Sequence, residues 1–342
     1  MSIGKNGADP RQRIRSGPNL AERLVNRVPQ ALSDATAKFV DSIKLSSVSE
    51  KVVRGHRVVV KRRNGYSEQL ADLGNLYFRM AGIPIRFWSK IEDWKRWETD
   101  CFRMLNGDRF RVFRSDAKTV CVAKLPGMSL WDHLNRGTLT RRMLESAAQE
   151  LRRAHQFWSK EFRGRWSHGD AGMANVIHNE ESGQARLIDF EIVHDKSLPA
   201  ESRHADDLLV FLLDLVAIAP GREWLPFALS FLNAYGNADV FEELKSQLAL
   251  PSGMAWIWWG VRTSFANPGK VKRRLAKLQD VVANLKHYRA TAAVRARQRR
   301  RASISCHKIS PGIPRASSRT RPIRESANAA SPGIPSRLPT TT

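Results

Sequence analysis

Cysteine is scarce in this chain of 342 residues, which has only Cys101, Cys121 and Cys306. Their spacing forms no paired pattern, so the sequence argues against a disulfide framework and a zinc site, and favours a reducing compartment. Long apolar runs are missing as well. The longest run, Leu208 to Pro220, is interrupted by Asp214 and is too short to span a bilayer.

Hydrophobic residues still make up 42% of the chain and charged residues 26%, which is an ordinary globular composition. This composition excludes a wholly disordered or collagen-like protein. The length predicts about two domains, at roughly 150 residues each. The N-terminus is polar and lacks the apolar stretch of a signal peptide, so we expect a cytoplasmic protein.

Acidic residues are few: 33 Asp and Glu stand against 57 Lys and Arg, which gives a formal net charge of +24. Such a charge favours anionic partners. Residues 295–342 alone hold eleven basic residues and one acidic residue. We expect a loose basic arm over residues 1–35 and a disordered Arg/Ser/Pro-rich tail over residues 293–342. The tail could contact an anionic membrane or nucleic acid weakly, or simply be solvated.

Between these ends, the chain consists of two parts with different sequence patterns. Residues 36–125 contain short β-like runs, and we expect two hairpins there, with turns at Gly55–His56 and Ser115–Ala117. Residues 126–292 are mostly helical in pattern. The sequence therefore predicts a strand-rich part followed by a helix-rich part.

Three helices are predicted in the second part. Thr140 is a good cap for a helix whose apolar face extends to Trp158, and Asn267–Pro268 is a good start for another. A third helix is expected over Leu208–Ala219. The apolar face after Thr140 consists of Met143, Leu144, Ala147, Ala148, Leu151, Ala154 and Trp158.

One short segment carries most of the chemistry. It reads His-Gly-Asp at residues 168–170 and has Asn175 five positions after Asp170. A hairpin predicted over residues 176–190 would return Asp189 to the same loop. Two carboxylates and one amide oxygen would then converge, and hard oxygen ligands of this kind suit Mg²⁺. Phosphoryl transfer needs such a metal, a base that positions the nucleophile, and a cation on the phosphates.

The segment resembles the catalytic motifs of the protein-kinase-like superfamily. Its His-Gly-Asp form is more similar to aminoglycoside phosphotransferases and lipopolysaccharide-core sugar kinases than to protein kinases. The resemblance covers roughly residues 40–290. It implies a bilobal α+β fold, with a small β-rich N-lobe at 36–125 and a helical C-lobe at 126–292. It also implies ATP and Mg²⁺ as cofactors, with Asp170 as catalytic base and Asn175 and Asp189 as metal ligands.

The resemblance also implies a nucleotide-binding lysine. Lys61 follows three valines on the second strand of the first hairpin, and resembles the strand lysine that reaches the nucleotide phosphates. Glu98 and Glu68 are the two candidates for its partner. Glu98 is preferred because its predicted helix directly precedes the second hairpin. Residues 64–93 would then be an insertion relative to a minimal kinase lobe.

The hinge that meets adenine through its backbone would fall at Ala123 to Leu125, where a plain strand-to-helix turn is the alternative. The sequence departs from protein kinases in two places. The glycine loop over the phosphates is absent, and Ser46–Ser49 are candidates to replace it. Glu191 stands where protein kinases have the glycine of Asp-Phe-Gly.

Two side-chain roles near the loop are also expected. His168 should tie the catalytic loop together by hydrogen bonds rather than titrate in the reaction. Asp206 or Asp207 either braces the loop from below or is merely a favourable acid at a helix start.

The sequence therefore predicts an ATP-dependent phosphotransferase that moves the γ-phosphoryl group to a hydroxyl acceptor, with a sugar or lipopolysaccharide-type acceptor favoured. A protein serine/threonine kinase is the first alternative. A basic nucleic-acid-binding or scaffold protein on an inactive kinase fold is the alternative from another class. The expected location is cytoplasmic, with a peripheral position at the inner face of the membrane as a variant.

Overall fold

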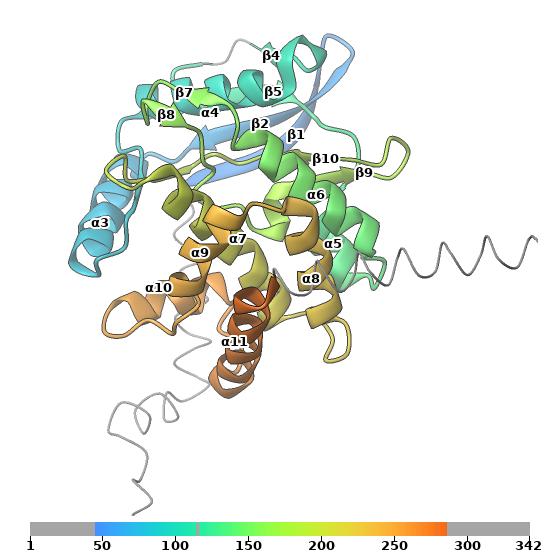
Figure 1. Cartoon of the computed structure of the whole chain (residues 1–342). Coiled ribbons are helices and arrows are strands. Elements are labelled where there is room, and N and C mark those ends of the chain that lie inside the picture. The colour runs from blue at the N-terminus through green and yellow to red at the C-terminus, as the bar shows by residue number, and fades with distance from the viewer. Residues whose placement is uncertain (1–44, 114–115, 286–342) are drawn as a thin grey trace, which may run out of the picture. The chain divides into compact units, whose positions relative to one another are not determined.

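The computed structural model describes residues 45–113 and 116–285. The first part of this range combines a four-stranded sheet with two helices, and the second part is mainly helical, in agreement with the predicted α+β order (Figure 1). The arm expected at 1–35 and the tail expected at 293–342 lie outside the described residues. The predicted boundaries between arm, lobes and tail stay predictions.

The N-terminal part is built on a four-stranded antiparallel sheet in the order β1-β2-β5-β4. Its first hairpin turns at Arg54 and Gly55, which both have positive φ angles of 50° and 77°. The turn therefore begins one residue before the predicted position. The strands are β1 (Ser46–Val53), β2 (His56–Arg63), β4 (Val112–Phe113) and β5 (Thr119–Ala123).

The second hairpin is shorter than expected, because Gly107–Arg109 form a 3-10 turn instead of the start of a strand. This turn follows helix α4 (Ile91–Asn106), which packs against the sheet with Trp94, Cys101 and Phe102 buried. The chain thus needs a tight link between helix and strand where the sequence pattern predicted an extended run.

The stretch predicted as an insertion has its own structure. It contains helix α3 (Ser67–Met80) and strand β3 (Ile85–Phe87). Strand β3 pairs antiparallel with β11 (Ile192–His194), which begins three residues after Asp189. The insertion is therefore joined to the segment that follows the candidate metal ligand.

The C-terminal part packs helices around α7 (Ala200–Ala217), which is buried on nearly all sides. It begins well before the predicted start at Leu208. The other elements are β6 (Met128–Ser129), α5 (Leu130–Asn135), α6 (Arg141–Ala154), β7 (Trp158–Ser159), β8 (Gly164–Arg165), η2 (Met173–Asn175), β9 (Val176–Asn179), β10 (Gln184–Leu187), α8 (Trp224–Tyr235), α9 (Ala238–Gln247), α10 (Ala255–Arg262) and α11 (Pro268–Ala283).

Both predicted helix caps are present. The Thr140 hydroxyl accepts a hydrogen bond from the Met143 backbone N–H at 3.3 Å, and the Asn267 side chain accepts one from Lys270 at 3.0 Å. The prediction for Trp158 is wrong: α6 ends at Ala154, and Trp158 lies in β7 with 69% of its surface exposed. The helical spacing continued in the sequence beyond the point where the chain turns.

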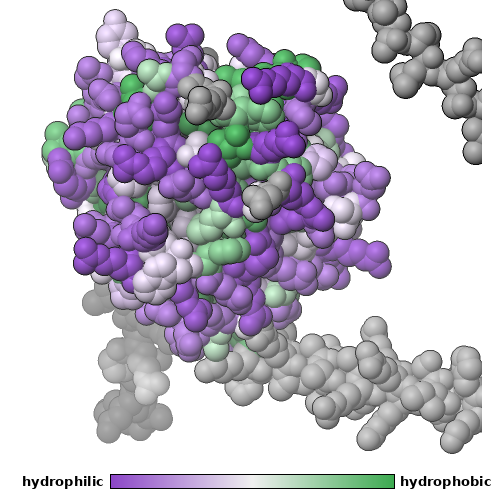
Figure 2. Space-filling model, turned by 90° about the horizontal axis from the view of Figure 1, so that it is seen from above, coloured by the Kyte–Doolittle hydropathy of each residue, from purple (hydrophilic) through white to green (hydrophobic). Residues whose placement is uncertain are grey.

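Seen from the side of the four-stranded sheet, the surface is mostly hydrophilic, with hydrophobic side chains visible in small groups (Figure 2). Within residues 45–113 and 116–285, no helix combines the length and the apolar character needed to cross a bilayer.

Candidate active site

The loop with the His-Gly-Asp motif lies between β8 and β9, and the hairpin β9–β10 brings Asp189 back to it. Asn179 pairs with Gln184 at the turn, and the Ile188 backbone N–H donates to the Asn175 carbonyl at 3.0 Å. The Asn175 amide nitrogen donates to the Asp170 carboxylate at 3.1 Å and to its carbonyl at 2.9 Å. The predicted hairpin thus assembles the loop, although its second strand ends at Leu187.

The underside of this loop rests on Asp207 of α7. Its carboxylate accepts the backbone N–H groups of His168 at 2.7 Å and Gly169 at 2.8 Å, and also meets His155 Nε2 at 3.0 Å. Burial alone would raise the pKa of Asp207, but the neighbouring histidines and these bonds lower it to about 2. Asp207 is therefore the brace, while Asp206 has other partners.

His168 holds the loop from within, as expected. Its Nε2 lies 3.0 Å from the Ile188 carbonyl, and its Nδ1 accepts the Asp170 backbone N–H at 3.2 Å. Gly169 is required here: its φ is +90°, and an added Cβ would lie 2.4 Å from the Ile192 carbonyl oxygen. The loop has little room to adopt another conformation.

Lys61 lies opposite this loop and bridges two acids. Its Nζ is 2.6 Å from Glu98 Oε1 and 2.8 Å from Asp189 Oδ1. The second Glu98 oxygen accepts the Phe190 backbone N–H at 2.9 Å. Glu68 instead accepts the Ile91 backbone N–H. The structure therefore brings Lys61 together with Glu98 and not with Glu68.

Burial and charge act against each other in this cluster. Burial by itself would lower the pKa of Lys61, but the negative charges of Asp189, Glu98 and Glu191 raise it above its ordinary value. Burial raises the pKa of Glu98, whereas the Lys61 charge holds that of Asp189 below its ordinary value against the same effect. A protonated lysine and an ionised Asp189 follow.

Asp170 is held differently. Burial raises its pKa to about 6, and the charges of Asp189 and Asp207 add to this, while Arg262 and Asn175 oppose it. A carboxylate with such a pKa is ionised at neutral pH and can still accept a proton from a nearby hydroxyl. Asp214 of α7, which accepts the Met173 backbone N–H at 2.7 Å, also has a raised pKa, of about 7, because it is buried.

The oxygen set fits a divalent cation that shares its shell with phosphates. Asn175 uses its nitrogen on Asp170, which leaves its amide oxygen for a metal, and Asp189 presents a carboxylate beside Lys61. Among the described residues, no cluster of three or more His, Cys, Asp or Glu side chains could hold a metal alone. Mg²⁺ usually takes one or two protein carboxylates and completes its shell with water and substrate phosphates.

The predicted hinge is only partly suited to adenine. The Ala123 N–H is bonded to the Arg111 carbonyl at 2.8 Å inside the sheet, and Lys124 donates to Arg57 at 2.9 Å. Leu125 is buried, and its backbone forms no hydrogen bond within the described residues. Of the two predicted hinge residues, Leu125 has the available N–H.

Two contacts were not foreseen from the sequence. The Ser46 hydroxyl donates to Glu191 Oε1 at 2.5 Å, so this serine contacts the residue that replaces the kinase glycine. Arg262 of α10 binds Asp206 through both terminal nitrogens, at 2.8 and 2.9 Å, and His194 lies 3.1 Å from Asp206. The adjacent acids 206–207 were the available signal, but nothing pointed to a partner so far along the chain.

The fold and the site follow the same order along the chain. An antiparallel sheet carries a lysine paired with a helix glutamate, and a helical part carries the Asp170 loop and the hairpin to Asp189. This order of elements is the one that the resemblance to the protein-kinase-like superfamily implies.

No family model matches the chain, and no curated protein matches it. Among solved structures, it is similar to the erythromycin complex of Rv3197 from Mycobacterium tuberculosis, with a TM-score of 0.33 and 19% identity over 54% of this chain and 51% of that chain. The ethanolamine kinase of Plasmodium vivax has a TM-score of 0.35 and 9% identity, over 73% and 89% respectively. The match thus spans about half the length of the Rv3197 chain. Scores of this size carry no argument about function.

Proposed function

We propose that the protein is an ATP- and Mg²⁺-dependent phosphotransferase with a hydroxyl-bearing acceptor. The observation that carries this proposal is the bridge from the buried Lys61 to the buried Glu98 and to the partly exposed Asp189, in the same site as an Asp170 carboxylate whose pKa is about 6. Burying so many charges is unfavourable unless they are closely paired. A cluster of charged side chains that is this unfavourable to bury usually belongs to a ligand-binding or catalytic site.

Each residue has one role in the proposed reaction. Asp170 orients the acceptor hydroxyl and takes its proton as that oxygen bonds to the γ-phosphorus, while the bond from this phosphorus to the ADP oxygen breaks. Asn175 and Asp189 would hold Mg²⁺, which neutralises phosphate charge when bound. Lys61, fixed by Glu98, stabilises the phosphates that are not transferred. Leu125 offers its backbone N–H to the adenine ring.

For the acceptor, we propose a sugar or lipopolysaccharide-type molecule. The segment between Glu191 and α7 is short, and part of it is used by β11, which pairs with β3 of the insertion. Protein kinases need free chain at this place to align a peptide. A strand already paired on one side supports a small or glycolipid acceptor over a protein serine or threonine.

The location we propose is the cytoplasm or the inner face of the membrane, since the basic residues beyond 293 suit an anionic surface. The same charge favours one other function, a nucleic-acid-binding or scaffold protein. A variant that lacks 293–342 separates the two. Phosphoryl transfer that survives while polyanion binding disappears would make the tail an accessory.

Thermal unfolding with ATP tests nucleotide binding directly. A ligand at 100 times its Kd stabilises the folded state by about 2.7 kcal/mol. We expect ATP to raise the Tm of the wild-type protein only when Mg²⁺ is present, and expect Asp189→Ala to lose this rise. An equal rise for both proteins would argue against Asp189 as a metal ligand.

Incubation with γ-labelled ATP and fractionated cell extract tests the acceptor. Label in the glycolipid or small-molecule fraction supports the proposed class, and label in protein bands supports the protein kinase. Asp170→Ala serves as the control in both fractions, because it should transfer no label into either.

A further inference from the structure

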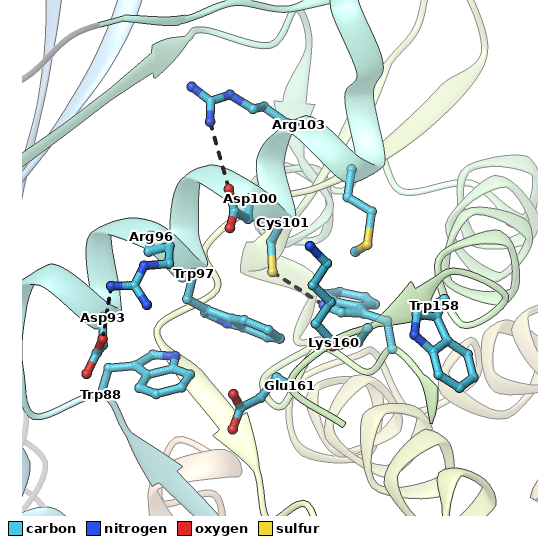
Figure 3. A pocket seen from close by; sticks show the side chains of 13 residues that line it. Trp88, Asp93, Arg96, Trp97, Asp100, Cys101, Arg103, Trp158, Lys160 and Glu161 are labelled. Carbon is cyan, nitrogen blue, oxygen red and sulfur yellow. Dashed lines mark hydrogen bonds and ion pairs between the residues drawn. The ribbon is translucent and has the colours of Figure 1, made fainter. Parts of the chain in front are cut away.

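A cavity lies beside α4, and neither Lys61 nor Glu98 lines it. It has a volume of about 590 Å³ and is lined by α4 together with Trp88, the 158–161 segment and Trp166. Figure 3 shows indole rings on several sides of it, with Lys160 extending toward α4 between Trp97 and Trp158. None of the residues assigned to the phosphoryl-transfer site lines it, so it is a separate cavity.

The size and walls suit a small flat molecule. Ligand cavities usually measure about 300–1,000 Å³ and have mostly apolar walls. Trp88 and Trp97 lie with their ring centres 6.0 Å apart, and Trp158 has 69% of its surface exposed at the rim. Aromatic rings pack well against such walls in stacked or edge-on arrangements. These features favour an aromatic ligand.

The charges indicate what else the ligand carries. The lining acids are already paired: Asp93 with Arg96 at 3.5 Å and Asp100 with Arg103 at 3.8 Å. Glu161 is likewise bound, by Arg86 at 2.8 Å. The Lys160 side chain is exposed, and among the described residues its ammonium forms no hydrogen bond or ion pair. The charged group in the cavity wall that lacks a partner is therefore the Lys160 ammonium, and an anionic group on the ligand could pair with it.

Two walls of the cavity also touch the phosphoryl-transfer site. Glu98 is on α4, between the lining residues Trp97 and Cys101. The Trp166 indole donates to Cys101 Sγ at 3.3 Å, and its ring lies edge-on to His168 at 5.8 Å and to Phe190 at 5.9 Å. A ligand in the cavity would therefore rest on the helix that holds Glu98 and on the residue that precedes the catalytic loop.

We propose that this cavity binds a small planar aromatic molecule with a carboxylate or phosphate group, and that its occupancy favours nucleotide binding. The cavity is present in the arrangement in which Lys61 and Glu98 are paired. The proposed coupling requires that the cavity bind its ligand more tightly in this arrangement than in one where the pair is broken, because only such a difference in affinity shifts the equilibrium. Linkage then requires that nucleotide and cavity ligand strengthen each other's binding. The coupling rests on the proposed function, whereas binding of the aromatic anion does not.

Calorimetric titration with naphthalene-2-carboxylate tests the site, with naphthalene-2-carboxamide as the neutral probe. We expect the carboxylate to bind wild-type protein about tenfold more tightly than the carboxamide, which is about 1.4 kcal/mol. Lys160→Met should remove this difference, and Trp158→Ala should weaken both probes. The matched control Lys196→Met, at another exposed lysine, should bind as wild type does.

Lys61→Met distinguishes the cavity from the proposed nucleotide site. This variant should still bind naphthalene-2-carboxylate, but more weakly than wild type does, because it has lost the Lys61–Glu98 pair that the cavity ligand favours. Mg-ADP should tighten binding of the probe to wild type severalfold. No binding, equal binding by Lys160→Met and wild type, or competition with Mg-ADP would overturn the site. Binding that Mg-ADP leaves unchanged would overturn the coupling. Absence of phosphoryl transfer, with these binding results intact, would instead count against the proposed function.

Discussion

The two sides of the catalytic loop use the same residue type in opposite ways. Asp170, within the loop, has Asn175 as its side-chain donor and has a pKa of about 6. Asp207, on the underside, accepts two backbone N–H groups and contacts His155, and has a pKa of about 2. The surroundings of each carboxylate explain this contrast: the charge of His194 and the contact with His155 outweigh burial at Asp207, whereas burial outweighs the charge of Arg262 at Asp170. The comparison teaches that the underside of the loop is tied into the fold, while Asp170 keeps few partners, as the proposed base requires.

The largest effect on stability is expected for Asp207→Ala. This change leaves the N–H groups of His168 and Gly169 buried without an acceptor, and leaves the Nε2 of His155 without its partner. We expect the free energy of unfolding to fall by about 3–5 kcal/mol. Urea denaturation measures this fall, and Asp280→Ala, at an exposed helical position, should change stability by less than about 0.5 kcal/mol. If Asp207→Ala lowered the free energy of unfolding only slightly, the stability of the loop's underside would not depend on Asp207, and the contrast with Asp170 would fail.

Gly169→Ala probes the same underside through the backbone. Its φ is +90° and its Cβ would meet the Ile192 carbonyl, whereas Gly183, at φ +66°, has open space around it. A positive φ costs an alanine about 1–2 kcal/mol, so this is the expected loss for Gly183→Ala. For Gly169→Ala we expect about 3 kcal/mol or more, because the backbone must also move. Equal losses in urea denaturation would mean that the loop can shift away from Ile192.

Asp170→Asn should act in the opposite direction and by a smaller amount. The pKa of Asp170 is raised from an ordinary 3.8 to about 6, so its favourable contribution is complete below 3.8 and is lost as the pH rises through 6. At pH 8 the buried charge destabilises the fold. One pKa unit corresponds to about 1.4 kcal/mol, and we expect Asp170→Asn to stabilise the protein by about 1–3 kcal/mol at pH 8.

Unfolding of wild type and Asp170→Asn at pH 4 and pH 8 checks the sign. The gain should be present at pH 8 and nearly absent at pH 4. A variant that is less stable than wild type at pH 8 would show that Asp170 has structural partners like those of Asp207.

The sequence was most informative where function depends on local spacing. Asp170, Asn175 and Asp189 lie on one loop and one short hairpin, so their proximity follows from a single turn prediction. Lys61 and Glu98 were chosen from strand pattern and element order, and the structure brings them within 2.6 Å. Their chemical roles remain predictions.

Contacts between distant segments could not be predicted in the same way. The pairing of β3 with β11 joins two strands of three residues each, which are too short to produce a pattern. The bond from Ser46 to Glu191 and the ion pair from Arg262 to Asp206 depend on how whole elements pack. Trp158 was misassigned because helical spacing in the sequence does not show where a helix ends.

Phosphoryl transfer by Asp170→Asn, measured in single turnover beside Mg-ATP binding, tests the central claim most directly. A positioned general base contributes about 10²–10⁴ to the rate. We predict that Asp170→Asn loses this factor, with Mg-ATP affinity close to that of wild type, and that the wild-type rate rises with pH through about 6. Equal transfer by the two proteins would contradict the role of Asp170 as the base.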